Sequence, residues 1–168
     1  KMLGLAQAMK SGLGTAAVCL SNGLVVGALV AANPLGDIVN PHTGAILAGT
    51  RMPGTTEPAD TLALLGRWTG AAPAADGRNT VIGVVATNGL LNKEQTNKVA
   101  QMAQDGVARA VRPAHTMFDG DTIFALATGE VEADATVVGA YAAEVMAEAL
   151  MRAALTAEGA GGLPAHCD

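Results

Sequence analysis

An Asn-Gly pair between two apolar runs is the feature that most constrains this fold. Residues 12–20 are GLGTAAVCL and residues 24–33 are LVVGALVAAN, with SNG at 21–23 between them. Asn-Gly accommodates the positive φ angles of a tight turn, so between two β-prone runs it predicts a hairpin. The second run is apolar almost throughout, which predicts a strand covered on both faces. Asn33 ends that strand, because Pro34 follows it and cannot donate to a ladder.

Three further segments are predicted to be strands because they are short, apolar and rich in β-branched residues. They cover residues 45–48, 80–87 (TVIGVVAT) and 122–127 (TIFALA). Residues 50–79 differ, because three of the seven prolines and several glycines fall there. This composition predicts an exposed segment with one short helix at residues 62–65.

Two longer helices are predicted in the second half. Asn92 followed three residues later by Gln95 has the pattern of a capping box. Apolar residues continue from there at helical spacing, namely Val99, Met102, Ala103, Val107 and Val111. Pro113 is expected to end this helix, and an alanine-rich helix is expected at residues 135–155. Helices and strands do not alternate regularly, so an α+β arrangement of layers is predicted.

Composition excludes several classes of protein. Half of the 168 residues are apolar and the formal charge is only −5, so the chain is not intrinsically disordered. The acidic excess argues against a nucleic-acid partner, which would need a basic stripe. The longest apolar stretch, residues 24–32, is far shorter than the roughly 20 residues of a spanning helix, so no membrane association is expected. The chain does not begin with Met, and we expect it to start inside a longer precursor.

Cofactor and metal sites are not predicted. The segment KSGLGT at residues 10–15 lacks both phosphate-loop patterns. The three histidines, His42, His115 and His166, have no metal-ligand spacing. Cys19 lies in an apolar strand and is predicted to be a buried, inert thiol. With Cys167 it makes only two cysteines, which fits a reducing compartment, and a cytoplasmic location is expected.

Thr80 is the first candidate reactive residue. It follows the exposed segment directly and begins an apolar strand. If the Asn79–Thr80 peptide bond were cut, the freed α-amine, with an unperturbed pKa of about 7.7–8.0, could act as base for the hydroxyl of the same residue. From residue type alone, a threonine that simply begins a strand remains the commoner case.

Asp119 and Asp121 are the second candidate. They lie in FDGDT at residues 118–122, and residues two apart in an extended chain point to the same side. The two carboxylates could therefore converge, hold an ammonium group and orient a hydroxyl. Spacing alone favours a solvated Asp-Gly turn instead.

Three runs together carry a resemblance to a known family. They are GRNTVIGVVATN, NKEQTNKVAQMAQDGVARAVRP and AHTMFDGDTIFALATGE. They resemble the DmpA-like self-processing aminopeptidases and amidases, nearest the threonine-nucleophile branch that includes the nylon-oligomer (6-aminohexanoate) hydrolases. The similarity extends through KSGLGTA and VAANPLG, so it covers most of residues 10–145.

The resemblance implies an αββα four-layer sandwich of the N-terminal-nucleophile-hydrolase type, of which this chain holds a part. It also implies a precursor that cuts itself between Asn79 and Thr80. Residues 1–79 would then be the C-terminal part of a large subunit, with a processing segment at about 50–79. Residues 80–168 would be the small subunit.

The resemblance also assigns roles to single residues. Thr80 matches the nucleophile, and Asn33 matches the asparagine that donates to the oxyanion. Asp119 and Asp121 match the acidic pair beside the nucleophile, and the Asp pair favours the nylon-hydrolase-like branch. Lys1 lies at about the right distance before Asn33 for the lysine of that branch.

The function implied is hydrolysis of an amide bond in a peptide or a short aliphatic amide. Processed subunits are expected to pair and to form a homo-oligomer of heterodimers. One alternative is an acyltransferase similar to ornithine acetyltransferase, although the cut there usually follows a small-residue motif and Arg78-Asn79 precedes Thr80 here. Another alternative is a catalytically silent structural module.

Overall fold

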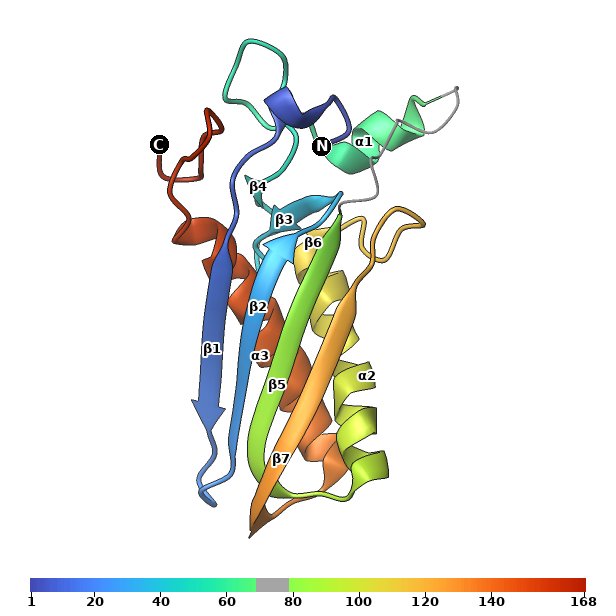
Figure 1. Ribbon diagram of the computed structural model, residues 1–168, viewed down its shortest axis with the longest axis vertical. Coiled ribbons are helices and arrows are strands. Elements are labelled where there is room, and N and C mark those ends of the chain that lie inside the picture. The colour runs from blue at the N-terminus through green and yellow to red at the C-terminus, as the bar shows by residue number, and fades with distance from the viewer. Residues whose placement is uncertain (69–78) are drawn as a thin grey trace.

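The computed structural model describes residues 1–68 and 79–168. Its main sheet has the strand order β1-β2-β5-β7 (Figure 1). These strands are β1 (Leu13–Cys19), β2 (Val25–Asn33), β5 (Thr80–Leu90) and β7 (Thr122–Glu132). The β1–β2 and β2–β5 pairs are antiparallel, whereas β5 and β7 run parallel.

The expected hairpin is confirmed. β1 and β2 pair from Leu13 opposite Ala31 to Cys19 opposite Val25. Gly23 has a φ of 83°, and the Leu20 amide donates to the Leu24 carbonyl oxygen across the turn at 2.8 Å. The Asn-Gly pair supplies the turn that its sequence predicts.

Two long helices cover one face of this sheet. They are α2 (Lys93–Ala110) and α3 (Ala135–Leu155), and both lie behind the sheet in Figure 1. The capping box at Asn92 and Gln95 is present at the start of α2. Small residues bring backbones close together: a Cβ atom on Gly14 would lie 1.9 Å from the Ala149 carbonyl oxygen of α3. Few aromatic side chains are needed in a core of this kind.

A second, smaller sheet has the order β4-β3-β6 and lies beside the upper end of the main sheet in Figure 1. It comprises β3 (Asp37–Val39), β4 (Ile46–Ala48) and β6 (Val111–Arg112). The remaining elements are a 3₁₀ turn at Leu5–Gln7 and the short helix α1 (Thr61–Gly66).

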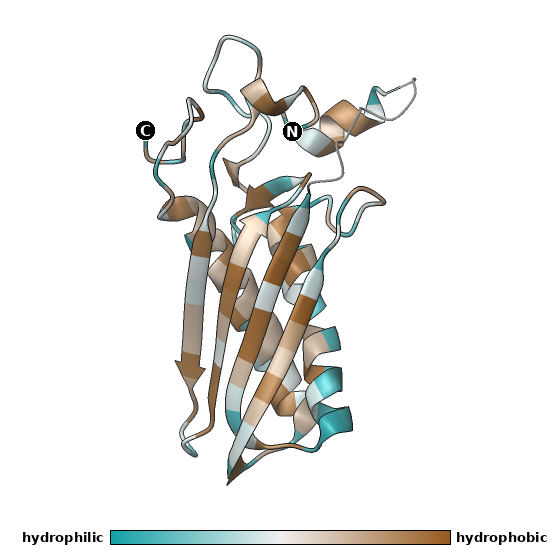
Figure 2. Ribbon diagram, in the orientation of Figure 1, coloured by the Kyte–Doolittle hydropathy of each residue, from teal (hydrophilic) through white to brown (hydrophobic). Residues whose placement is uncertain are grey.

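The other face of the main sheet is open within the described part of the chain. Residues alternate between buried and exposed along β1, β2 and β5. Large apolar side chains stand on the open face, with Leu29, Ile82 and Phe124 exposed by 44%, 50% and 61%. Apolar residues recur along all four strands, whereas hydrophilic ones gather on the outer turns of α2 (Figure 2). The prediction that β2 is covered on both faces is therefore wrong for this chain by itself.

Several boundaries differ from the sequence predictions. β5 and β7 extend beyond residues 87 and 127, and α2 ends at Ala110 instead of at Pro113 because residues 111–112 pair with β3 as strand β6. Cys19 is exposed, which corrects the prediction of a buried thiol, since its side chain points to the open face at the end of β1.

The segment at 50–79 is also less exposed than expected. Thr50 and Thr61 are fully buried, and residues 69–78 lie outside the described part. The buried Asp37 carboxylate explains this anchoring. It accepts the backbone amides of Thr50 at 3.1 Å and Thr61 at 2.6 Å, and the Thr61 hydroxyl at 2.7 Å. Asp37 therefore ties the start of α1 to β3.

The chain is α+β, as expected, and contributes one sheet and one helical layer of an αββα arrangement. Among the described helices, none combines the length and apolar character needed to cross a bilayer.

Candidate active site

The residues singled out from the sequence gather at the upper end of the main sheet in Figure 1. There β2 ends at Asn33, β5 begins at Thr80, and the loop before β7 arrives beside them. Asn33 pairs with Thr80 in the β2–β5 ladder, and Asn79 forms a parallel bridge with Asp119. Residues 33, 79–80 and 119–121 thus become neighbours through strand register.

Lys1 joins this cluster through its side chain. Its ammonium nitrogen Nζ donates to Asn33 Oδ1 at 2.5 Å, to the Asn33 carbonyl oxygen at 3.1 Å and to Asn79 Oδ1 at 3.1 Å. A lysine ammonium only donates hydrogen bonds, so the amide oxygen of Asn33 faces Lys1 and its NH₂ group is turned away. An asparagine oriented in this way presents a donor, which is what oxyanion stabilisation requires.

Asp119 is bound on two sides. Its Oδ1 accepts the Leu35 amide at 2.9 Å, two residues beyond Asn33. Its Oδ2 accepts the Thr116 hydroxyl at 2.5 Å and the Thr116 amide at 3.3 Å. The side chain therefore holds its own loop and fixes that loop to the end of β2.

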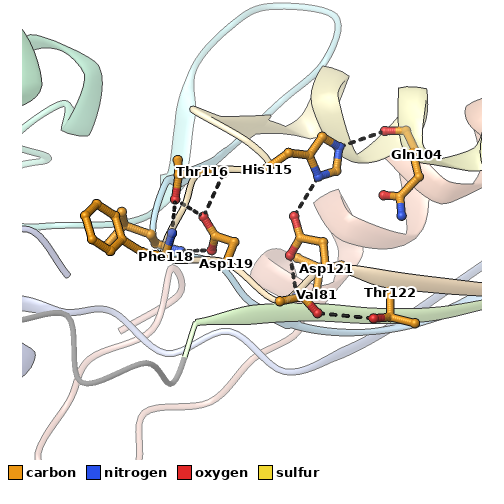
Figure 3. A network of polar contacts seen from close by, with 10 residues as sticks. Val81, Gln104, His115, Thr116, Phe118, Asp119, Asp121 and Thr122 are labelled. Carbon is orange, nitrogen blue, oxygen red and sulfur yellow. Dashed lines mark hydrogen bonds and ion pairs between the residues drawn. The ribbon is translucent and has the colours of Figure 1, made fainter.

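Asp121 has different partners. Its Oδ1 accepts the Val81 amide at 2.8 Å, and its Oδ2 lies 2.8 Å from His115 Nδ1. The Asp121 side chain is only 5% exposed, whereas that of His115 is 38% exposed. Figure 3 shows Asp119 pointing towards Thr116 and Asp121 pointing towards His115. The two carboxylates therefore do not converge on one point while the Asn79–Thr80 bond is intact, contrary to the simple extended-chain expectation.

Thr80 itself lies directly against the loop. A Cβ atom on Gly120 would lie 2.8 Å from Thr80 Oγ1, and the Gly120 amide donates to the Asn79 carbonyl oxygen at 3.0 Å. The threonine hydroxyl and the preceding carbonyl are thus both next to Gly120.

His115 is a site residue that the sequence interpretation missed. It has a left-handed backbone, with a φ of 53°, which is uncommon for any residue except glycine. Its Nε2 lies 3.4 Å from the Gln104 carbonyl oxygen of α2, so the ring spans from α2 to Asp121. A histidine six residues before a buried carboxylate carries no local sequence signal of this contact.

A cavity of about 370 Å³ opens on the Lys1 side of the cluster. Lys1, Asn33, Lys10 and Ser11 are among its lining residues, and Thr80 is not. Across residues 1–68 and 79–168, His, Cys, Asp and Glu side chains form no group suited to a metal ion. The described residues bring a hydroxyl, an amide donor, an ammonium, an imidazole and two carboxylates together at this site.

The fold of this chain is similar to that of a solved structure. The L-aminopeptidase D-Ala-esterase/amidase of Ochrobactrum anthropi, described as a variant of the Ntn-hydrolase fold, superposes with a TM-score of 0.62 at 21% identity. The match covers 94% of this chain and 44% of that one. The fold is therefore that of the Ntn-hydrolase aminopeptidases.

The sequence profile of Peptidase family S58 matches residues 4–167, and the chain belongs to that family. An uncharacterised aminopeptidase of Mycobacterium leprae is 40% identical over 181 aligned positions, covering 95% of this chain and 48% of that protein. The 6-aminohexanoate-oligomer endohydrolase of a Kocuria species is 33% identical over 95 positions, covering 49% of this chain and 27% of that enzyme. The chain spans about half the length of the aminopeptidase relative.

Proposed function

We propose that the protein is an amide-bond hydrolase that activates itself by cutting the Asn79–Thr80 bond. The observation that carries the proposal is the position of Thr80, whose hydroxyl and preceding carbonyl both lie next to Gly120, beside Asn33 and Lys1. Membership of a peptidase family, and relatives that include aminopeptidases and a 6-aminohexanoate-oligomer hydrolase, support amide hydrolysis.

Cleavage would give Thr80 a free α-amine that can act as the base for its own hydroxyl. Its new α-amine and its hydroxyl would belong to one residue, which is a recognised way of activating threonine. Asn33, with its amide oxygen held by Lys1, would donate from Nδ2 to the oxyanion of the substrate. Asp119 and Asp121 would set the position and charge environment of that amine. Residues 1–79 and 80–168 would then be the two processed subunits.

The direct test is the intact mass of the purified protein under denaturing conditions. Cleavage gives a new chain beginning at Thr80, and Thr80→Ala is expected to leave the bond uncut and to abolish amidase activity. Thr80→Ser should retain part of both, since a hydroxyl remains. Thr15→Ala, which removes an exposed threonine from β1 of the same sheet, is the matched control and should cleave normally. Cleavage at this bond in Thr80→Ala would overturn the assignment.

An acyltransferase is the alternative that uses the same nucleophile. Hydrolysis of a p-nitroanilide amide, compared with acetyl transfer from an acetylated amino acid, separates the two activities. The curated relatives reported above favour hydrolysis, because their names describe an aminopeptidase and an oligomer hydrolase. We infer that the substrate is a peptide or a short aliphatic amide, and that the protein acts in the cytoplasm without a cofactor.

We infer that the open face of the main sheet packs against a second sheet. Exposed Leu29, Ile82 and Phe124 make that face apolar, and such patches mark contact surfaces. An αββα sandwich buries this type of face between its two sheets. Paired subunits and a homo-oligomer of heterodimers follow as expectations, which light scattering of the whole protein at micromolar concentration would test. A monomer would contradict the homo-oligomer.

A further inference from the structure

The backbone amide of Gly120 is aimed at the carbonyl that self-cleavage would attack. The Gly120 N–H donates to the Asn79 carbonyl oxygen at 3.0 Å, so a backbone donor already contacts the oxygen on which negative charge would develop. Asn79 is only 4% exposed, so water competes little for this carbonyl. We propose that Gly120 N–H stabilises the oxyanion formed during self-cleavage, an inference that rests on the proposed function.

The bond changes in this step balance. Thr80 Oγ forms a bond to the Asn79 carbonyl carbon, and the carbonyl π electrons move to the oxygen that Gly120 N–H contacts. As the carbonyl re-forms, the C–N bond breaks, and the proton from Thr80 Oγ ends on the Thr80 nitrogen. Water then adds to the ester carbon, the bond to Oγ breaks, and Oγ regains a proton. The products are an Asn79 carboxyl group, which releases its proton to solvent at neutral pH, and a free Thr80 amine.

Glycine at position 120 is explained by the nucleophile. The φ angle of Gly120 lies outside the left-handed region, so its backbone conformation does not require glycine. A Cβ atom there, however, would lie 2.8 Å from Thr80 Oγ1, a separation too short for an ordinary contact. Only glycine lets this amide approach the carbonyl while the hydroxyl stays beside it.

The two aspartates hold this amide from either side. Asp119 is fixed to Leu35 and Thr116, and Asp121 is fixed to Val81 and His115. A donor held rigidly before the reaction pays no reorganisation cost when the charge develops.

Two different donors would then stabilise the two oxyanions. Gly120 N–H would serve the oxyanion of the protein's own peptide bond, and Asn33 would serve that of the substrate. A defect at Gly120 should therefore slow maturation. A defect at Asn33 should lower turnover in matured molecules.

An ester at position 120 tests the donor alone. Cell-free translation can place glycolic acid in place of Gly120, which removes the N–H and adds no side chain. Self-cleavage, followed by intact mass against time, should slow by about 10²–10³, as for the loss of one oxyanion donor. The control replaces Phe118 with phenyllactic acid, whose missing N–H served Thr116 Oγ1 instead.

The outcomes separate this inference from the proposed function. A wild-type protein that never cuts at Asn79–Thr80 overturns both. Normal cleavage in the wild type and equally fast cleavage in the Gly120 ester overturns this inference alone. A readout independent of activity is the NMR scalar coupling across the hydrogen bond, between the Gly120 nitrogen and the Asn79 carbonyl carbon, in uncut Thr80→Ala. Absence of that coupling would also overturn the inference.

Discussion

Asn33 pairs with Thr80 at the last position of the β2–β5 ladder, so the amide side chain and the candidate nucleophile are neighbours across two strands. Forty-six residues separate them in sequence, and the antiparallel register alone brings them together. Lys1 orients the Asn33 side chain, because its ammonium group donates a hydrogen bond to the amide oxygen.

Asn33→Ala is expected to lower kcat of the matured enzyme by about 10²–10³ and to change KM little, because one oxyanion donor is lost. Steady-state kinetics on an anilide substrate measures this split. Asn88→Ala, in the same strand as Thr80 but near its far end, is the matched control. A change confined to KM would assign Asn33 to substrate binding.

Lys1→Met should also lower kcat, because the Asn33 side chain loses the ammonium that orients it. The double variant Lys1→Met/Asn33→Ala should therefore be little worse than Asn33→Ala alone.

Asp119→Asn and Asp121→Asn are expected to lower activity by about 10²–10⁴, the range for losing acid–base support. If the proposed cleavage frees the Thr80 α-amine, a nearby carboxylate would favour its protonated form, and the amine must be neutral to act as base. Removing the charge should therefore move the acidic limb of the kcat/KM profile to lower pH. Asp105→Asn, exposed on α2, is the control. If both variants keep near-full activity and the acidic limb of the pH profile does not move, Asp119 and Asp121 only hold the loop in place.

His115→Gly is expected to lower kcat by about tenfold or more, because Asp121 loses the ring that positions it. Glycine adopts the φ of 53° freely, so this variant avoids backbone strain. His115→Asn should restore most of the loss, since asparagine tolerates the same backbone and offers a side-chain donor. Equal kcat in the wild type and in His115→Gly would remove His115 from the site.

The Arg109–Glu144 ion pair is expected to make a pH-dependent contribution to the free energy of unfolding. Arg109 nitrogens lie 2.7 and 3.1 Å from the Glu144 oxygens, and this guanidinium holds the Glu144 pKa below its ordinary 4.5. The contribution to the free energy of unfolding is therefore present above pH 4.5 and is lost as pH falls through the lowered pKa. Because the pair is exposed, Glu144→Gln should cost only about 0.2–1 kcal/mol at pH 7.

Urea unfolding of wild type and Glu144→Gln at pH 7 and at about pH 3 measures this difference. The gap should narrow at the lower pH, because the stabilising contribution of the charged Glu144 carboxylate is lost as pH falls through its lowered pKa. Arg109→Met, and the double variant, complete the cycle that isolates the pairwise energy. A gap of the same size at both pH values would show that the substitution acts through packing.

Local signals predicted much of the secondary structure. Asn-Gly at positions 22–23 defined the hairpin, and Asn92 with Gln95 defined the start of α2, because each depends on backbone groups a few residues away. Pro113 did not end α2, because pairing of Val111 and Arg112 with β3 ended it first. That pairing joins segments more than seventy residues apart and leaves no local pattern.

Strand alternation explains the two errors of burial. Cys19 and the outward residues of β2 lie in apolar runs, so hydropathy alone predicts that they are covered. The helices pack on one face only, and the side chains of the other face are therefore exposed in this chain. The apolar pattern indicates that a face is suited to burial. Which element covers that face depends on how the layers assemble.

The sequence by itself determined most of the longer elements, the Thr80 and FDGDT motifs and the family to which they point, because these depend on residue type and short spacing. Only the tertiary structure decided that Asp119 and Asp121 face different partners, that His115 contacts Asp121, and that Gly120 N–H meets the Asn79 carbonyl. Each of these contacts depends on the register between strands and on the path of the loop before β7. Register is set by the packing of the whole sheet, which no short segment encodes.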